Sequence, residues 1–194
     1  MLKIGITGGI GSGKSMVGKI LESMGYPVFY SDDQAKLLAD RNPEIRHDLI
    51  DLFGPEVYNE AGLNRPFLAE KIFGDETLRQ QVNQIIHPRV REAFDQFADN
   101  HASPFVFNEA AILIETGAHK NFDALVLVTA PEEIRIQRVQ ARDNTDTTSI
   151  KQRMKKQWTD DEKRPHADYE IINDGEQPVL EQLEKLIFYL QSKA

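Results

Sequence analysis

The sequence predicts an α/β fold in which helices flank a parallel β-sheet. Short apolar runs alternate along the chain with segments whose apolar residues recur at helical spacing. The run at residues 124–129 is unbroken, which is typical of a parallel strand that is covered on both faces. The chain has 194 residues, of which 40% are hydrophobic. This is enough for one domain with a substantial core.

The predicted strands are separated by helical patterns or turn signals. The first ends at a glycine-rich stretch, and the second is followed by Ser31, a residue type that caps helices. The other three lie in the second half of the chain, as in an alternating α/β sheet. We expect strands at residues 2–6, 27–30, 104–107, 124–129 and 169–172.

Helices are predicted between and after these strands. The first begins at Lys14, the next follows Ser31, and another follows Pro131, a residue suited to a helix start. The closing helix has apolar residues at helical spacing from 179 to 190. No linker, repeat or low-complexity tract interrupts the sequence, so we predict a single domain, 1–194.

Two insertions are expected in this domain. The chain from about 42 to 103 has helical spacing and is predicted to form a helical lobe. Pro88 lies within it, and proline lacks an amide donor and disfavours helical backbone at the preceding residue. We therefore expect two helices that meet at the "HPR" sequence. The second insertion, at about 139–165, is polar and basic and is predicted to be a lid.

The composition excludes several classes of protein. Asp and Glu number 31 against 23 Lys and Arg, so a protein that coats nucleic acid or an anionic membrane is not expected. The chain has no cysteine, and hence no disulfide or thiolate metal site. No segment approaches the roughly 20 apolar residues of a membrane span, and the N-terminus lacks a signal-peptide pattern. We expect a cytoplasmic protein whose partners include neither nucleic acid nor membrane.

A glycine-rich stretch, "GITGGIGSGKSM" at residues 5–16, follows the first strand and precedes the first helix. Gly8, Gly13, Lys14 and Ser15 match G-x-x-x-x-G-K-[ST]. Such a loop can point consecutive amides at a polyphosphate, while the lysine approaches the β- and γ-phosphates and the serine hydroxyl binds Mg²⁺. The stretch predicts a P-loop NTPase core that binds ATP. We expect the nucleotide to contact Gly9, Gly11, Ser12, Gly13, Lys14, Ser15 and Met16.

Other motifs separate the classes of P-loop protein. The chain lacks the N-K-x-D element of GTPases, and its D-x-x-G match at residues 51–54 lies on a predicted amphipathic helix. The apolar run that ends at Glu109 matches the metal-binding strand of motor and transport ATPases only in part. A short chain with insertions favours a small-molecule kinase, in which mobile lobes close over two substrates.

Residues 135–164 are more basic than the rest of the chain. They contain nine basic and five acidic residues, a formal charge of +4 in a chain of −8. Arg138 and Arg142 are four residues apart, so they share a helical face from which two guanidinium groups can converge on phosphate. We interpret this pair as phosphate ligands in a lid that closes over ATP. The lysines of the segment are interpreted as a solvated surface.

Two acids follow the second strand, at the sheet edge where α/β proteins gather their ligands. The carboxylate of Asp32 or Asp33 could orient or deprotonate an acceptor hydroxyl, or hold Mg²⁺ through water. The alternative is that these acids cap the next helix and compensate its dipole. Both interpretations stay open, since one acid can cap while the other acts.

Six stretches together resemble the dephospho-coenzyme A kinase family. They are "TGGIGSGKS", "SDD", "IIHPRVR", "AAILIETG", "RIQRVQARD" and "ADYEIINDG", and the resemblance runs essentially end to end. It implies an ATP-dependent phosphorylation of the ribose 3′-hydroxyl of dephospho-CoA, the last step of coenzyme A synthesis, with Mg²⁺. It also implies a core related to nucleoside-monophosphate kinases, with a helical substrate lobe and a lid.

The resemblance implies roles on the acceptor side. Asp32 stands at the second acid of the family's D-A-D motif and is the candidate general base, and Asp33 is the alternative that shares this work. The first acid of the motif is replaced by Tyr30 in this chain. His87 and Arg91 belong to a segment that is expected to look toward the acceptor. The alternative for His87 is a buried, hydrogen-bonded imidazole at a kink.

The resemblance implies further roles for residues of the second half of the chain. Glu115 is expected to position substrate or metal, with a helix-end role as the alternative. Arg138 and Arg142 are expected at the phosphates, and Arg138 joins Lys14 as a catalytic residue. Asn173 is expected near the adenine, although its "NDG" sequence also fits an ordinary turn.

Two other functions remain as alternatives. One is a kinase of the same build that acts on a nucleoside, nucleotide or sugar. The other is a binding module in which ATP drives a conformational switch for a protein or RNA partner, because the basic lid could bind RNA. We expect ATP and dephospho-CoA as the small-molecule partners, and a monomer or a weak homo-oligomer.

Overall fold

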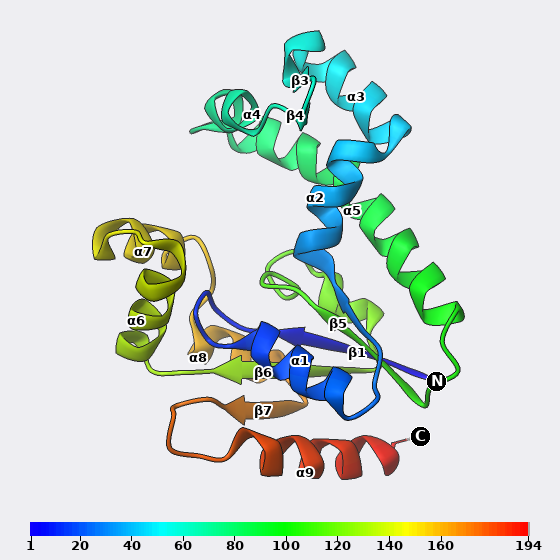
Figure 1. The fold of residues 1–194 in the computed structure, drawn as a ribbon, viewed down its shortest axis with the longest axis vertical. Coiled ribbons are helices and arrows are strands. Elements are labelled where there is room, and N and C mark those ends of the chain that lie inside the picture. Colours follow the sequence, from blue (N-terminus) through cyan, green and yellow to red (C-terminus); the bar gives the residue numbers. More distant parts are fainter. Residues whose placement is uncertain (194) are drawn as a thin grey trace. The chain divides into compact units, whose positions relative to one another are not determined.

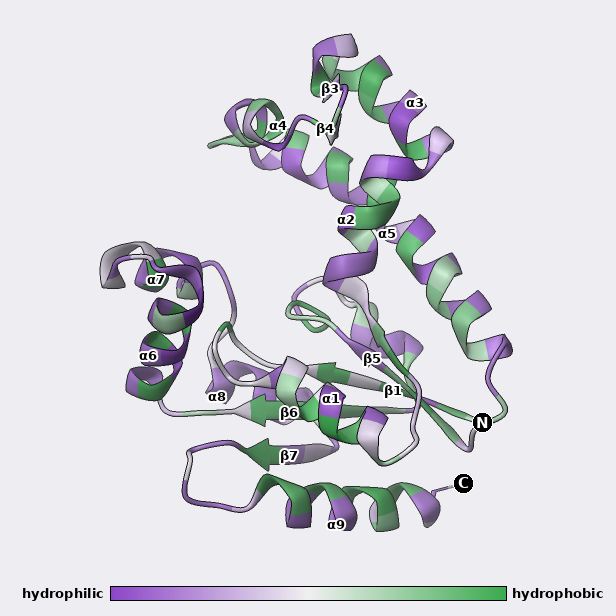
Figure 2. Cartoon of the chain, in the orientation of Figure 1, coloured by the Kyte–Doolittle hydropathy of each residue, from purple (hydrophilic) through white to green (hydrophobic). Residues whose placement is uncertain are grey.

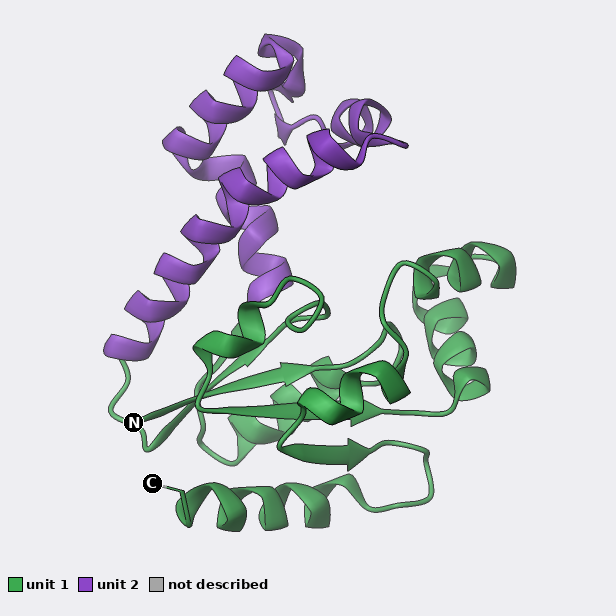
Figure 3. Cartoon of the chain, turned by 180° about the vertical axis from the view of Figure 1, so that it is seen from behind, with its two compact units in different colours: residues 1–30, 101–194 green, residues 31–100 purple. Residues whose placement is uncertain are grey.

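The computed structural model describes residues 1–193, which form two compact units (Figures 1 and 3). Met1–Tyr30 and the chain from His101 onward make up the unit with the large sheet, called the sheet unit below. Ser31–Asn100 make up the other, called the helical unit. The helical unit therefore includes most of the expected insertion and also the helix that begins at Ser31.

The sheet unit is built on five parallel strands in the order β2-β5-β1-β6-β7. The strands are β1 (Leu2–Thr7), β2 (Val28–Tyr30), β5 (Phe105–Glu109), β6 (Ala124–Thr129) and β7 (Tyr169–Ile172). The loop that carries the G-x-x-x-x-G-K-S motif follows β1, the central strand. The predicted α/β fold with a parallel sheet is confirmed, and each predicted strand is found at its expected place.

One face of this sheet is covered by α1 (Lys14–Ser23) and α9 (Val179–Gln191). Ile6 of β1, Leu21 of α1 and Leu183 of α9 are all fully buried in one apolar cluster. Burial of each such side chain contributes roughly 1.5–3 kcal/mol. Figure 2 shows the mainly hydrophobic character of β6 and α9. The cluster therefore holds the start of α1, and with it the end of the loop, against the sheet.

The opposite face of β1 is covered by the segment between β5 and β6. Successive side chains of a strand point to opposite faces, and Gly5 stands where this segment approaches. A Cβ at Gly5 would lie 2.8 Å from Leu125 Cδ1 and 3.0 Å from Leu113 Cδ1. The glycine therefore leaves room for a second apolar cluster, which includes both leucines.

The predicted lid contains short helices with clear capping signals. Its elements are the end of α6 (Glu132–Asp143), α7 (Thr147–Met154), α8 (Asp160–Lys163) and η3 (Arg164–His166). Asn144 ends α6 in the left-handed region at φ 48°. Asp146 caps α7 through the Ser149 amide, and Thr159 and Glu162 form a capping box at α8.

The helical unit has its own apolar core. Its elements are α2 (Ser31–Arg41), α3 (Pro43–Phe53), η1 (Pro55–Val57), β3 (Tyr58–Asn59), β4 (Gly62–Leu63), α4 (Arg65–Ile72) and α5 (Glu76–Asp99). Ile45, Leu49, Val57 and Val82 are buried in the cluster that joins them. The β3–β4 hairpin was not predicted, because strands of two residues leave no alternation in the sequence.

The prediction of two helices that meet at Pro88 was wrong, because α5 runs through the proline as one helix of 24 residues. A proline inside a helix costs about 3 kcal/mol through the lost hydrogen bond and the steric clash. Packing of α5 against α2 and α3 offsets this cost, since Val82 and Phe94 on either side of Pro88 are buried.

Among the helices of residues 1–193, neither α5 nor any other is long and apolar enough to cross a membrane.

Candidate active site

The phosphate-binding loop, residues 8–13, requires glycine at two positions at its end. Gly11 has φ 78° and Gly13 has φ 98°, both in the left-handed region. A Cβ at Gly13 would lie 2.0 Å from Asn173 Nδ2. Gly13 is also the N-cap of α1. The positive end of this helix therefore lies at the loop, as an anion site requires.

The serines of the motif lie in different surroundings. Ser15, together with Met16, is exposed in the first turn of α1. Ser12 is fully buried within the loop, and its Oγ has no hydrogen-bond partner among the residues that the structure describes. A buried hydroxyl without a partner is costly unless a ligand binds it.

Lys14 is held by a carboxylate from a neighbouring strand. Its Nζ is 3.8 Å from Glu109 Oε1 and donates to the Gly9 carbonyl at 3.5 Å. Both charged side chains are buried, at 9% and 7% exposure. Glu109 is the last residue of β5 and lies opposite Ile6 of β1. The parallel pairing of β1 and β5 thus brings this carboxylate to the loop.

Sequence reasoning left Glu109 without a role. The sequence does show an apolar strand that ends in this acid, but the run matches a metal-binding strand only in part. Glu109 reaches Lys14 because β5 lies beside β1 in the sheet, and this order of strands is a property of the fold.

Arg138 and Asn173 meet at the loop, while their predicted roles at the phosphates and the adenine stay predictions. Asn173 Nδ2 donates to the Ser12 carbonyl at 2.8 Å, and Arg138 Nη1 donates to the same oxygen at 3.4 Å. Arg138 Nη2 also donates to Asn173 Oδ1 at 3.2 Å. Asn173 follows β7 directly and is buried. One residue from α6 and one from the sheet edge therefore fix the same side of the loop.

Glu115 forms a buried ion pair that the sequence did not indicate. Its Oε1 lies 2.9 Å from Lys163 Nζ and accepts from the Trp158 amide at 3.1 Å. Lys163 also donates to the Ala111 carbonyl at 3.0 Å and is completely buried. The interpretation of the lid lysines as a solvated surface was therefore wrong for Lys163. It lies on α8, within the segment that was predicted to be a lid.

The predicted acceptor residues lie at one end of the helical unit. Asp32 and Asp33 occupy the first turn of α2, and His87 and Arg91 lie on α5, which packs against α2. Burial lowers the pKa of His87, as does the charge of Arg91, while the charge of Asp32 opposes this shift. Asp33 differs from Asp32 in that it pairs with Lys36 at 2.8 Å on the exposed surface of α2.

Comparison with known proteins identifies the family. The family model for dephospho-CoA kinase matches residues 2–178 of this chain. The chain belongs to the dephospho-CoA kinase family. A dephospho-CoA kinase of Bacteroides fragilis is 46% identical over 193 residues, which cover 99% of this chain and 94% of the relative. A dephospho-CoA kinase of Porphyromonas gingivalis is 39% identical over 194 residues, which cover 100% and 96%.

A solved structure agrees with this assignment. A crystal structure of a Thermus thermophilus protein superposes with a TM-score of 0.84 at 34% identity, covering 99% of this chain and 97% of that one. A solved dephospho-CoA kinase from Campylobacter jejuni has the same fold, with a TM-score of 0.63 at 23% identity, covering 97% of this chain and 95% of that one. The expected fold, a P-loop kinase core with a parallel sheet flanked by helices, is confirmed.

This member of the dephospho-CoA kinase family has a tyrosine where the first acid of the D-A-D motif is expected. Tyr30 ends β2, lies opposite Glu109 of β5, and donates its hydroxyl to Glu22 Oε2 at 3.0 Å. Burial and the hydrogen bond to Glu22 raise the pKa of Tyr30 well above its ordinary value. The hydroxyl therefore stays protonated and cannot replace the missing carboxylate as a base.

Arg142 does not contact the loop in the structure. Its Nε donates to Asp143 Oδ1 at 2.6 Å, and Arg153 Nη1 lies 2.8 Å from Asp143 Oδ2. These two hydrogen bonds hold the pKa of Asp143 far below its usual range. The phosphate role that the dephospho-CoA kinase resemblance implies for Arg142 stays a prediction.

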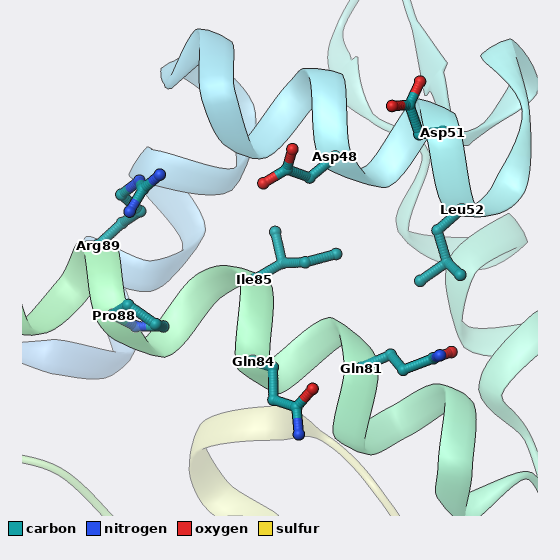
Figure 4. Close-up of a pocket in the computed structure, with 8 residues that line it drawn as sticks. All are labelled: Asp48, Asp51, Leu52, Gln81, Gln84, Ile85, Pro88 and Arg89. Carbon is teal, nitrogen blue, oxygen red and sulfur yellow. The ribbon is translucent and has the colours of Figure 1, made fainter.

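A groove in the helical unit contains none of the predicted site residues. It has a volume of about 450 Å³ and lies between α3 and α5. Figure 4 shows Leu52 and Ile85 pointing toward each other from these helices, with Asp48 and Arg89 nearby. We assign this groove no part in the chemistry of the dephospho-CoA kinase.

Proposed function

We propose that the protein transfers the γ-phosphoryl group of ATP to the ribose 3′-hydroxyl of dephospho-CoA, which gives coenzyme A and ADP. The observation that carries this proposal is the phosphate-binding loop itself. Lys14, Arg138 and Asn173 all contact its backbone, in a chain of the dephospho-CoA kinase family.

On the donor side, the loop amides and the start of α1 bind the phosphates of ATP. Lys14 places its charge near the β- and γ-phosphates, and Arg138 neutralises charge that develops as the phosphoryl group moves. Ser12 offers its buried hydroxyl to the nucleotide, and Asn173 lies where the adenine edge is expected. Arg142 can also bind phosphate if its guanidinium group leaves Asp143.

On the acceptor side, Asp32 orients the 3′-hydroxyl and accepts its proton as the new P–O bond forms and the bond to the leaving ADP breaks. Burial keeps His87 neutral near pH 7, so it can donate one hydrogen bond to the acceptor while Arg91 supplies positive charge. Asp33 is the weaker candidate for the base, because Lys36 already pairs with it. Glu115 contacts substrate only through the oxygen that Lys163 does not bind.

The residues present fit a magnesium ion that arrives with the nucleotide. Residues 1–193 contain no group of three or more His, Asp or Glu side chains that could hold a metal, and Mg²⁺ typically takes only one or two protein ligands in addition to substrate phosphates. Ser15 is exposed at the start of α1, and Glu109 ends β5 beside Lys14. These two would hold the ion, directly or through water. Bound Mg²⁺ supplies charge neutralisation on the phosphates.

The test is an ADP-release assay with magnesium-ATP and a panel of acceptors. Dephospho-CoA should give one ADP per coenzyme A formed, whereas AMP, adenosine and shikimate should give little. Turnover of one of the other acceptors at the dephospho-CoA rate would instead favour another small-molecule kinase. ADP release without any phosphorylated acceptor, stimulated by RNA or a protein, would favour a nucleotide-driven binding module.

We further propose that the protein works in the cytoplasm as a monomer or weak homo-oligomer, since it draws on the ATP pool of the cell. Light scattering at several protein concentrations measures the oligomeric state. A concentration-independent dimer would contradict this part of the proposal.

A further inference from the structure

The phosphate-binding loop is hydrogen-bonded by two side chains from distant parts of the chain, Arg135 of α6 and Gln157 of the predicted lid. The Ile10 amide donates to Gln157 Oε1 at 2.8 Å. The Ile10 carbonyl accepts from Arg135 Nε at 2.9 Å. Both polar backbone groups of one loop residue are therefore satisfied by side chains that lie more than 120 residues away in the sequence.

Arg135 is fitted closely against the glycines of the loop. It is only 9% exposed, although arginine is rarely buried unless it is paired. A Cβ at Gly9 would lie 2.0 Å from Arg135 Nη2, and a Cβ at Gly11 would lie 2.5 Å from the Arg135 carbonyl. Gly9 thus has a second reason to be glycine besides contact with phosphate, because any side chain there would displace Arg135.

A carboxylate completes the arrangement. Asp160, at the start of α8, lies 3.5 Å from Arg135 Nη1. Burial raises the pKa of Asp160, while the charges of Arg135 and Lys163 oppose this shift. Lys163, on the same short helix, is anchored to Glu115 and the Ala111 carbonyl. The chain that leaves the lid is therefore fixed to the sheet unit close to the point where it grips the loop.

We propose that Gln157 and Arg135 are positioning residues that hold the phosphate-binding loop in its nucleotide-ready shape. The Ile10 amide is turned toward Gln157 and is kept out of the phosphate cradle. A loop that is already ordered loses less conformational freedom when ATP binds. This role goes beyond the proposed reaction, because it concerns the nucleotide and does not depend on which acceptor is phosphorylated.

Helix α7 of the predicted lid is separated by a cavity from the side chains that bind the loop. A cavity of about 860 Å³ is lined by Arg135, Gln157 and Asp160 and by Lys151 and Met154 of α7. Space therefore lies between α7 and the residues that grip the loop. Substitutions on the exposed face of α7 should leave the loop as it is, which makes Gln152 a matched control position.

The first experiment measures hydrogen exchange of residues 8–13 in the protein without nucleotide. Gln157→Met keeps the size of the side chain but removes the acceptor, so exchange of the loop amides should speed up while β1 and β6 keep their protection. Gln157→Glu retains an acceptor oxygen and should restore protection. Gln152→Met should behave as wild type.

The second experiment measures the affinity for magnesium-ATP by titration of the fluorescence of Trp158, the only tryptophan of the chain, and KM and kcat by the ADP-release assay. Gln157→Met should weaken ATP binding about fivefold, the effect of one lost hydrogen bond. It should leave kcat and the acceptor KM near their wild-type values. Arg135→Lys lacks the fork that serves both Ile10 and Asp160, and should act in the same direction.

The proposal is overturned if Gln157→Met has wild-type loop protection and wild-type ATP affinity. It is also overturned if Gln157→Met loses protection evenly across the sheet unit, or lowers kcat and both substrate affinities together, because the side chain would then serve only general stability. If Gln157→Met does not fold, Arg135→Lys decides by the same two readouts. Failure of dephospho-CoA as acceptor would refute the proposed reaction and leave these results intact.

Discussion

The residues assigned to the phosphoryl donor and those assigned to the acceptor lie in different surroundings. In the sheet unit, Gln157 and side chains from α6 and the end of β7 contact one short loop, and Glu109 of β5 pairs with Lys14 directly after it. Most of these side chains are buried. In the helical unit, Asp32 lies exposed in the first turn of a helix, and its side chain forms no recorded hydrogen bond with residues 1–193. We infer that the donor residues are held in place before the nucleotide binds, whereas Asp32 is free to contact the substrate directly.

The largest effect is expected from the loss of the loop lysine. Lys14→Met should lower kcat/KM about 10³-fold, because a preorganised charge at the phosphates is removed. The ADP-release assay measures this. Lys19→Met, on the exposed side of the same helix, is the control and should remain active. Wild-type activity of Lys14→Met would end the assignment of the loop as the donor site.

Asp32→Asn is expected to lower kcat about 10²-fold, toward the lower end of the range for general bases, because phosphoryl transfer needs little help from a base. The KM for ATP should hardly change. Asp33→Asn is the matched comparison and should have a smaller effect, since Asp33 already pairs with Lys36. Equal losses in the two variants would show that the helical unit does not distinguish its acids as proposed.

Loss of the buried Lys163–Glu115 pair should reduce the stability of the protein more than its turnover. Lys163→Met leaves Glu115 buried without its cation, which should lower the free energy of unfolding of the sheet unit by about 3–5 kcal/mol. Urea denaturation measures the change. Adding Glu115→Gln should recover part of the loss, and Lys156→Met, on the exposed lid surface, should cost little. A single variant as stable as wild type would contradict the pair's role.

The smallest effect concerns the pH dependence of the helical unit. Burial lowers the pKa of His87 below its ordinary value of about 6.5. Between the folded and unfolded pKa values the unfolded state binds more protons, so stability rises with pH there and is lost as pH falls below about 6.5. His87→Gln should flatten this dependence in urea titrations between about pH 7 and 5.

His47→Gln is the control for that titration, because His47 is exposed on α3 of the same unit. It should leave the slope that His87 causes in place. An unchanged slope in His87→Gln would mean that the burial of His87 is not linked to unfolding.

Local patterns were sufficient for the five strands of the large sheet and for the phosphate-binding loop. The apolar run of β6 coincides with the predicted strand, because unbroken apolar residues bounded by polar ones are typical of a buried strand. The loop could be recognised because its chemistry depends on glycine conformations and on a lysine and serine at fixed spacing. The spacing of Arg138 and Arg142 pointed to phosphate, whereas Asn173 was singled out only through the family resemblance.

Long-range packing decided what local patterns could not. The "HPR" sequence predicted a break, but α5 continues through Pro88 because the packing of its neighbours outweighs a local penalty. Lys163 looked like one of several surface lysines, and only the fold places it against Glu115. In each case the local preference is worth a few kcal/mol at most, and a buried contact from elsewhere in the chain overrides it.

The sequence by itself determined the strand–loop–helix unit that binds phosphate, since backbone conformation, helix start and residue spacing all act within a few neighbouring residues. Only the tertiary structure decided which side chains surround that loop. Glu109, Arg135 and Gln157 come close to it through the strand order and the return of the chain from the lid. Contacts between residues so far apart depend on the topology of the whole sheet unit, and no local pattern encodes them.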